Sequence, residues 1–496
     1  MKHFWTKSLL TLFVTGMSLG LGSSSVSAQY NSSILAANAP VTPAYEPATQ
    51  AATPQGYYAA DAVDLESRIS NLEAQLKKKQ DKPDPQKGFT RVIDGRIYFD
   101  SYSVHQSGSS TKTESLNTLK NYNGIRDLRV GVKGEGYGIF DYKVDLCFIE
   151  KTGTGTGTNQ SGVNLKDVWF GVKNVPLLEY VRIGHYRIEE GISVLTGGTN
   201  TTFLEFDGRD FATVRRIGIS SRHLWARDQI RFFAGFFYNE DIAKNQRYSV
   251  RDNQGSITNF RLTFLPHASR KDGKIDGKRF LLFGGNYSYF DASKTNPTTY
   301  VNSSFTERFA TVDQMTLATY ANAIPTNGYH KFGLEFAGQN GPFSVQSEAY
   351  VNHYNSVKIG TTTKDRTIFG SYITVRYFLT GDYRKFSAES AIWSTVDMKH
   401  NLDLRKIGDY NFAERLGAWE VAAKWGYIET SQLFGLASNV FAGSVNDFTL
   451  GLNWYWSPQA RWMFNYIHAV PSQIRDGQSR DHSDTDIFAA SFRYNF

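Results

Sequence analysis

The sequence predicts an all-β fold, a sixteen-stranded antiparallel transmembrane β-barrel with a short N-terminal helical coiled-coil segment. Apolar and polar residues alternate with a period of two through most of residues 90–496, which is typical of strands with one apolar face. The predicted connections alternate between short and long, as in barrels whose turns gather at one end. The same alternation runs through the last twelve residues to Phe496. An edge strand of a soluble sandwich would share this local pattern, but it gives no reason for the alternating connection lengths.

The composition supports a protein built of long strands. Among 496 residues, aromatics make up 15%, and there are 43 Gly but only 13 Pro. No stretch after the N-terminus reaches the ~18 consecutive apolar residues of a membrane-spanning helix, which excludes a helical membrane protein. The net charge of +7 is too mild to argue for a nucleic-acid partner. Cys147 is the single cysteine, so the sequence predicts no internal disulfide, and no spacing suggests a metal site or a cofactor.

Residues 1–28 have the three parts of a signal peptide. Lys2 and Lys7 form the basic start, an apolar core follows, and small residues precede Gln29. An N-terminal anchor is the alternative, but the apolar run is short. We therefore expect the mature protein to leave the cytoplasm, with residues 29–61 as a flexible linker rich in Ala, Pro, Thr and Ser.

Residues 62–80 predict an amphipathic helix. Its apolar residues are spaced by four, three and four, which gives a heptad seam just under two heptads long. One such helix is too short to be stable alone, so self-association into a small homo-oligomer is expected. The alternative is a helix lying on a membrane or against the barrel. A basic linker at 81–89 follows, and the whole N-terminal segment is expected in the periplasm. The seam residues are Leu65, Ile69, Leu72 and Leu76.

The barrel prediction rests on about sixteen alternating runs in residues 90–496. Short connections such as 134–138 and 457–460 are expected on the periplasmic side, and long ones such as 187–214 and 352–366 on the extracellular side. Residues 381–416 are an exception to this alternation, because they form a long connection on the side where the connections are otherwise short. The expected strands are 90–102, 123–133, 141–149, 164–173, 180–186, 215–223, 230–238, 258–265, 279–290, 330–339, 343–351, 369–380, 417–427, 447–456, 461–468 and the C-terminal run.

Several motifs, in this order along the chain, resemble the phosphate-selective porin O/P family of outer-membrane barrels. The resemblance covers most of residues 90–496. It implies a sixteen-stranded trimeric porin in which one loop of each subunit folds into the pore. Members are often labelled phosphate-selective, although that label is applied more widely than the property. The matching stretches are Leu165-Lys166-Asp167, Val181 to Gly184, Arg215 to Ile219, Gly341 to Glu348, Tyr377 to Asp382, Gly417 to Lys424 and Thr449 to Tyr455.

A pore needs a width and an electric field instead of catalytic groups, so no catalytic residue is predicted. Alternate residues of a barrel strand face opposite sides, and we take the more apolar set of each strand as lipid-facing. The other set then places twelve basic and six acidic residues in the lumen, which favours anions. Arginine also suits phosphate and carboxylate through its paired N–H donors. The opposing interpretation is that interior charges pair with one another, for example Glu420 with Lys424. The basic positions are Arg129, Lys133, Lys143, Arg182, Arg216, Arg231, Arg261, Lys331, Arg376, Lys424, Arg461 and Arg493, with Arg215 at the rim; the acidic ones are Asp141, Asp145, Asp167, Glu335, Glu348 and Glu420.

The third long connection, 187–214, is the candidate constriction loop, because the resembling family folds this loop inward. Its five acidic residues outnumber its two basic ones, which weakens the case for a phosphate filter. Its charged residues are Arg187, Glu189, Glu190, Glu205, Asp207, Arg209 and Asp210.

The sequence thus predicts a multi-pass outer-membrane porin for passive diffusion of small hydrophilic solutes, with a preference for anions and phosphate as a candidate. The expected partners are outer-membrane lipids, small anionic solutes and the barrel-insertion machinery, which would recognise Phe496. One alternative is a structural protein that tethers the envelope through its N-terminal segment. The other is a general or sugar porin without anion selectivity.

Overall fold

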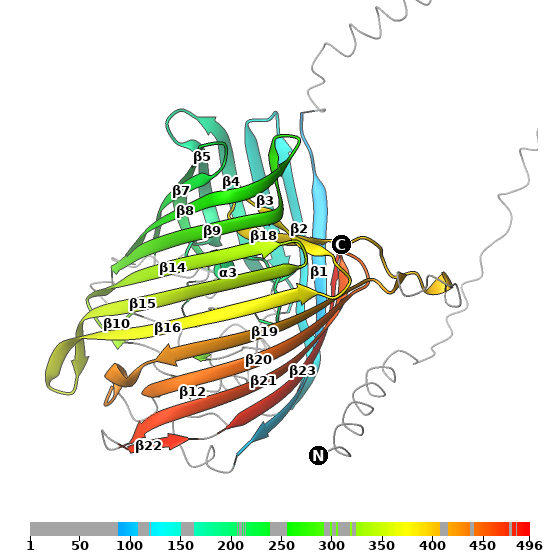
Figure 1. Ribbon diagram of the computed structural model, residues 1–496. Coiled ribbons are helices and arrows are strands. Elements are labelled where there is room, and N and C mark those ends of the chain that lie inside the picture. Colours follow the sequence, from blue (N-terminus) through cyan, green and yellow to red (C-terminus); the bar gives the residue numbers. More distant parts are fainter. Residues whose placement is uncertain are drawn as a thin grey trace, which may run out of the picture. The chain divides into compact units, whose positions relative to one another are not determined.

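The barrel is seen in a computed structural model of the chain (Figure 1). Residues 1–87 lie outside the described residues, and with them the predicted signal peptide, linkers and coiled-coil helix with its seam Leu65, Ile69, Leu72 and Leu76. No described helix has the length and apolarity to cross a membrane. The structure describes residues 88–107, 119, 121–149, 163–205, 207, 211, 213, 215–238, 255–291, 298–299, 304–305, 318–319, 324–406, 415–436, 441–475, 479–482 and 484–496.

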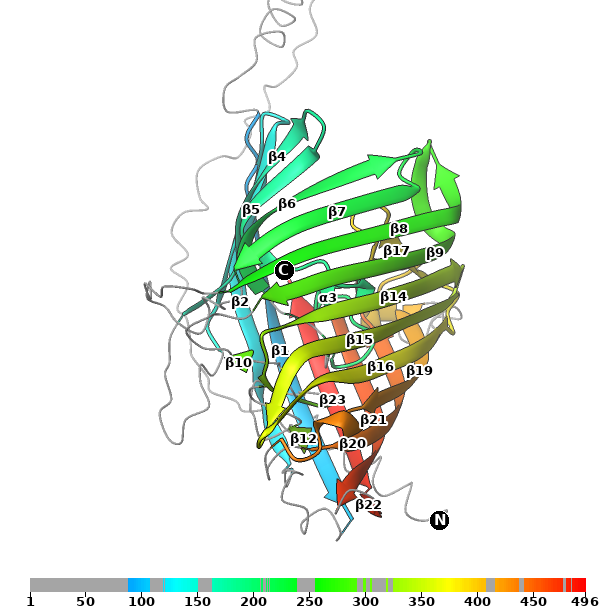
Figure 2. The same ribbon diagram turned by 90° about the vertical axis from the view of Figure 1, so that its left-hand side faces the viewer.

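The predicted fold is confirmed: in the described part of the chain, sixteen antiparallel strands form one closed barrel. Each strand pairs with its neighbour in sequence, and β1 pairs with β23 from Arg96 opposite Asn495 to Gln106 opposite Thr485. Figures 1 and 2 both show the blue β1 beside the red β23. The strands are β1 Val92–Gln106, β2 Tyr122–Gly136, β3 Phe140–Cys147, β4 Asn164–Val175, β5 Glu179–Arg187, β6 Arg215–Trp225, β7 Ile230–Tyr238, β8 Ser256–Lys271, β9 Lys274–Asp291, β14 Gly328–Asn340, β15 Phe343–Ile359, β16 Thr362–Phe378, β19 Ala418–Glu429, β20 Gly443–Tyr455, β21 Ala460–Arg475 and β23 Thr485–Asn495.

The period-two alternation places apolar side chains on the outside of the barrel. On β7, for example, Phe236 is exposed while its neighbours Gly235 and Phe237 turn inward, and Phe237 is buried. Inside, buried aromatic and aliphatic side chains pack around a segment between β5 and β6 that carries the short helix α3, Ile192–Leu195. Both ribbon views show α3 within the ring of strands (Figures 1 and 2).

Two predicted connections are shorter than expected. The prediction of a long extracellular loop at 352–366 is wrong, because β15 and β16 continue through these residues as a paired ribbon. The ribbon turns at Gly360, whose φ of 60° suits glycine. Likewise β8 and β9 extend toward each other and turn at Asp272 and Gly273. The remaining short elements are β10 Thr298–Thr299, β11 Ser304–Phe305, β12 Ala318–Thr319, β13 Ile324–Pro325, β17 Tyr383–Ser387, β18 Ile392–Asp397, β22 Ser479–His482, and the 3-10 helices η4 Leu404–Lys406 and η6 Ser431–Leu433.

Candidate functional site

The inner loop, which we define as the described residues between Arg187 and Arg215, crosses the barrel interior. Arg187 begins it by donating to the carbonyl oxygens of Val194 and Thr196. The backbone N–H of Ile192 donates to Glu348 Oε1 on β15 at 2.7 Å, and the N–H of Ser193 to Oε2 at 3.3 Å. A buried carboxylate thus holds the beginning of α3 against the wall.

Two carboxylates at the beginning of the inner loop bind basic residues of β7, β8 and β14. Glu189 forms ion pairs with Arg231 and with Arg261, the latter at 3.5 Å. Glu190 is fully buried and contacts the Lys331 Nζ at 2.8 Å. Burial alone would raise the pKa of Glu189, but the Arg231 and Arg261 guanidinium groups outweigh burial and hold that pKa below its ordinary value.

Two further carboxylates fix the end of the loop. Glu205 pairs with Arg126 on β2. Asp207 accepts a hydrogen bond from Thr374 at 3.0 Å and lies 3.9 Å from Arg376. All four described loop carboxylates therefore point at the barrel wall. The acidic surplus that the sequence placed in this loop is used for attachment, although Arg209 and Asp210 lie outside the described residues.

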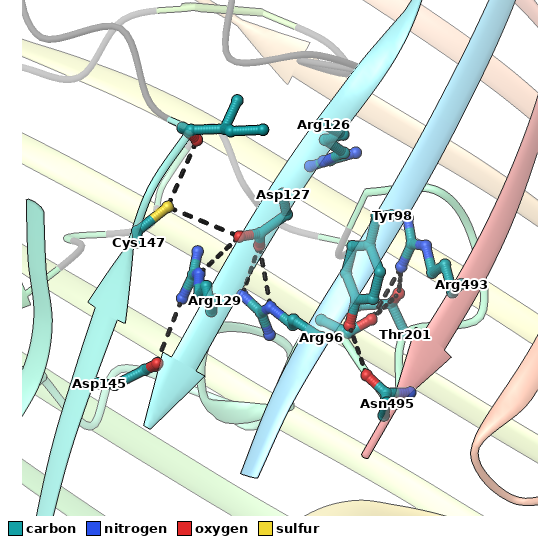
Figure 3. A network of polar contacts seen from close by, with 12 residues as sticks. Arg96, Tyr98, Arg126, Asp127, Arg129, Asp145, Cys147, Thr201, Arg493 and Asn495 are labelled. Carbon is teal, nitrogen blue, oxygen red and sulfur yellow. Dashed lines mark hydrogen bonds and ion pairs between the residues drawn. The ribbon is translucent and has the colours of Figure 1, made fainter. Parts of the chain in front are cut away.

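The middle of the inner loop is attached to the last strands. Arg493 on β23 donates to the carbonyl oxygen of Gly198 and to Thr201 Oγ1, both at 2.8 Å (Figure 3). Asn453 on β20 donates to the Thr202 carbonyl oxygen at 2.9 Å, and Asn465 on β21 accepts from the Leu204 N–H at the same distance. With the contacts above, the loop is held to β2, β7, β8, β14, β15, β16, β20, β21 and β23.

A second segment also enters the interior, and sequence reasoning missed it. The turn-end hairpin, β17 and β18, lies in the long connection 381–416. Its Arg384 binds Glu420 with Nε–Oε1 3.0 Å and Nη2–Oε2 2.8 Å, and donates to the Asn200 carbonyl oxygen of the inner loop. The Phe386 ring stacks on Phe280 at 4.1 Å. The unusual length of 381–416 on the short-turn side was the signal in the sequence.

A network of charges lines β1 to β6, and we call it the basic wall: Arg96, Arg129, Lys143 and Arg215 with Asp127, Asp145 and Asp167. Figure 3 shows how Asp127 lies between two guanidinium groups, with Arg96 Nε at 2.9 Å and Arg129 Nε at 2.7 Å. Asp167 receives Arg215 Nε at 2.7 Å and lies 3.3 Å from Lys143 Nζ. Arg96, two residues before Tyr98 on the first strand, was absent from the predicted set.

Three basic side chains of the basic wall are more exposed than three on the opposite wall. The side chains of Arg96, Arg129 and Lys143 are 15%, 12% and 24% exposed. Those of Arg261, Lys331 and Arg384, beneath the inner loop and the turn-end hairpin, are 0 to 1% exposed. The inward-folded segments thus cover these three residues, whereas water reaches part of the basic wall. Lys424 and Asp447 on β19 and β20 are also 11% and 14% exposed.

The remaining predicted residues lie elsewhere in the interior or at its ends. The expected pairing of Glu420 with Lys424 is wrong, because Glu420 binds Arg384 and Lys424 binds Asp447 at 2.7 Å. Parity predicts the side of the barrel that a residue faces, but not its partner. Lys133 pairs with Asp94 at 2.7 Å, Arg461 donates to the Tyr455 hydroxyl at 3.0 Å, Arg216 donates to the Arg215 carbonyl oxygen at 2.8 Å, and Arg182 lies against Trp169.

The described residues contain no group of His, Cys, Asp and Glu side chains that could hold a metal ion. The site is a set of charged and aromatic side chains around a solvent-reached interior, with two segments folded into it.

Comparison with known proteins identifies the barrel. The family model described as phosphate-selective porin O and P matches residues 103–496. Porin O of Pseudomonas aeruginosa is 26% identical over 170 residues, which cover 33% of this chain and 35% of that protein. The match thus spans about a third of that relative's length. Two solved structures have a similar fold. OprB of Pseudomonas putida is 8% identical, with 83% of this chain and 94% of that chain covered and a TM-score of 0.47. An anion-selective porin of Comamonas acidovorans is 10% identical, with 82% of this chain and 100% of that chain covered and a TM-score of 0.45. Because the family model covers most of the chain, this protein belongs to the phosphate-selective porin O and P family of outer-membrane porins.

Proposed function

We propose that this porin lets small hydrophilic solutes diffuse passively across the outer membrane, with a preference for anions. The observation that carries the proposal is the surplus of basic side chains in the basic wall, which water reaches in part. The four described loop carboxylates face the wall that they bind, while solvent reaches the basic wall.

The sign of the preference follows from the charges that a passing ion would meet. In the basic wall, four basic side chains share three carboxylates, so one positive charge is not compensated within the network. Arg182 is a further basic side chain of the lumen, and it forms no ion pair among the described residues. Low-dielectric walls strengthen the field of such charges on an ion in the lumen. An uncompensated charge of this size favours anions and does not exclude cations.

Phosphate is a candidate solute with weaker support. Each guanidinium group of the basic wall already has a carboxylate partner, and phosphate would have to compete with Asp127 or Asp167 for the same N–H donors. A wall of this kind supports general passage of small anions better than a dedicated phosphate filter.

The test is a single-channel recording of the full-length protein in a potassium chloride gradient. We expect a reversal potential of anion-selective sign, reduced when Arg129 and Lys143 are both replaced by Gln. A cation-selective sign would refute the anion preference, and a potential near zero would favour the general porin. Phosphate preference additionally requires that low-millimolar phosphate block the chloride current.

The assembly is also a proposal. The heptad seam at 62–80 motivates a homotrimer, and chemical cross-linking of the intact protein and of a variant lacking 29–88 tests it. A trimer that persists without 29–88 would show that the helix is not needed. If the variant lacking 29–88 conducts normally but its cells lose envelope integrity, the alternative of a structural protein that tethers the envelope would be favoured.

A further inference from the structure

Arg182 differs from the other basic residues of the lumen in what surrounds it. Its Cζ lies 4.1 Å from the centroid of the Trp169 ring and 5.3 Å from the rings of Tyr180 and Tyr186. Among the described residues it forms no ion pair, and its guanidinium makes one hydrogen bond, from Nε to the Tyr180 hydroxyl at 3.1 Å. Both terminal nitrogens therefore remain for a solute.

The neighbouring strands are built to hold this guanidinium in place. Gly171 on β4 and Ser220 on β6 lie directly opposite Arg182. A Cβ on Gly171 would come within 2.2 Å of the Tyr180 hydroxyl, so a larger residue would displace that ring. Tyr180 in turn donates to Asp141 at 2.9 Å. Arg182 is thus fixed by rings and by a hydroxyl, and not by a carboxylate that a solute would have to displace.

We propose that Arg182 and Trp169 form a lumenal subsite for arylcarboxylates, that is, a carboxylate attached to a flat aromatic ring. This proposal rests on the proposed passage of anions and names a solute class for it. The two terminal nitrogens of a guanidinium match the two oxygens of a carboxylate. The indole is larger than the guanidinium that covers it, and Trp169 is only partly buried. An aryl group on the bound carboxylate therefore lies beside an apolar ring surface.

The same geometry argues against a purely inorganic anion at this position. A tetrahedral phosphate gains nothing from the surrounding rings and loses hydration against them. Acetate binds the guanidinium edge but lacks the ring. Arylcarboxylates gain from both parts of the subsite, so they are expected to bind best.

Block of the chloride current by benzoate, with acetate as the comparison, tests the subsite in the full-length protein. Benzoate is expected to block the wild-type channel at about tenfold lower concentration than acetate. W169L keeps apolar volume but removes the ring face, and R182K keeps the charge but removes the planar fork. Both variants should lose the difference between benzoate and acetate.

Arg222 offers a matched control. It lies 4.5 Å from the Tyr180 ring but is paired with Glu389, so R222K should keep the benzoate preference. Equal block by benzoate and acetate in the wild type, a preference retained in W169L, or an equal loss in R222K would each overturn the subsite. The reversal potential without benzoate is recorded separately for every variant. A cation-selective reversal potential of the wild type would refute the proposed function, whatever the benzoate result. R182K preserves the charge, so a change in its benzoate block reports on the subsite and not on charge selectivity.

Discussion

Arg261 and Glu335 meet side-on inside the barrel, with Nε–Oε1 2.9 Å and Nη2–Oε2 2.7 Å, and both side chains are fully excluded from solvent. The pair joins β8 to β14 across β9, where Gly284 has no side chain to separate them. Arg261 also donates to the Ala391 carbonyl oxygen of the turn-end hairpin at 3.0 Å. One guanidinium thus links two strands and an inward-folded segment.

Replacing Glu335 by Gln is expected to destabilise the barrel by about 3 kcal/mol, because it removes the doubly bonded charge partner of the buried Arg261 and leaves only the more distant Glu189 at 3.5 Å. Guanidinium-induced unfolding in lipid vesicles measures the loss. E135Q is the control, since Glu135 is exposed in its pair with Lys173. Equal stability of E335Q and the wild type would contradict this account of the pair.

Lys331→Met is expected to detach the beginning of the inner loop, because Glu190 would remain buried with no cation beside it. The detached loop leaves the lumen more open, so single-channel conductance and current noise should rise. K133M removes a half-exposed lysine from the end of the barrel and should leave both unchanged. Normal noise in K331M would show that the Lys331–Glu190 contact does not hold the loop.

The two loop carboxylates with shifted pKa values predict opposite effects of neutralisation. The lowered pKa of Glu189 means that its attachment is stable above the ordinary value of 4.5 and is lost only as the pH falls through the lower folded-state value. Burial raises the pKa of Asp207, and the Lys424 and Arg376 charges reverse this only in part, so its charge disfavours the attached loop at neutral pH.

The Glu189 attachment should therefore persist from neutral pH down to about 4.5 and weaken below it, with a rise in current noise. E189Q should show loop noise already at neutral pH, and D207N should not. If D207N were noisy at neutral pH and E189Q quiet, the roles given to these two carboxylates in holding the loop would be refuted.

Trp393→Ala is expected to release the turn-end hairpin. The Trp393 side chain is buried, its ring lies 5.3 Å from that of Phe280, and its Nε1 donates to Gln346 at 2.6 Å. Its removal costs about 3 to 5 kcal/mol of packing. A higher single-channel conductance is the expected readout. W425A, on the exposed outer face, is the control and should conduct normally. An unchanged W393A channel would mean that the hairpin stays in place without this ring.

The barrel could be predicted because its pattern is local. The alternation on β7 or β23 is visible within ten residues, and it also determines which side chains face inward. The partners could not be predicted, since Glu190 and Lys331 are 141 residues apart and Arg384 reaches Glu420 from the turn-end hairpin, which is not part of the barrel wall. Arg96 was missed because the consecutive apolar residues Ile97, Tyr98 and Phe99 hide the alternation on β1. The length of 381–416 indicated an additional segment on the short-turn side, but it did not indicate that this segment, the turn-end hairpin, enters the barrel.

The attachment of the inner loop to both ends of the sheet has a consequence for the order of folding. Its contacts reach Arg126 on β2 and Arg493 on β23, and Arg493 is 292 residues from its partner Thr201. Contacts this distant form late, because closing long loops is entropically costly. No complete surface for the loop exists until β23 pairs with β1. The inner loop can therefore make its full set of wall contacts only after the barrel closes, so the complete pore interior is among the last parts of the molecule to form.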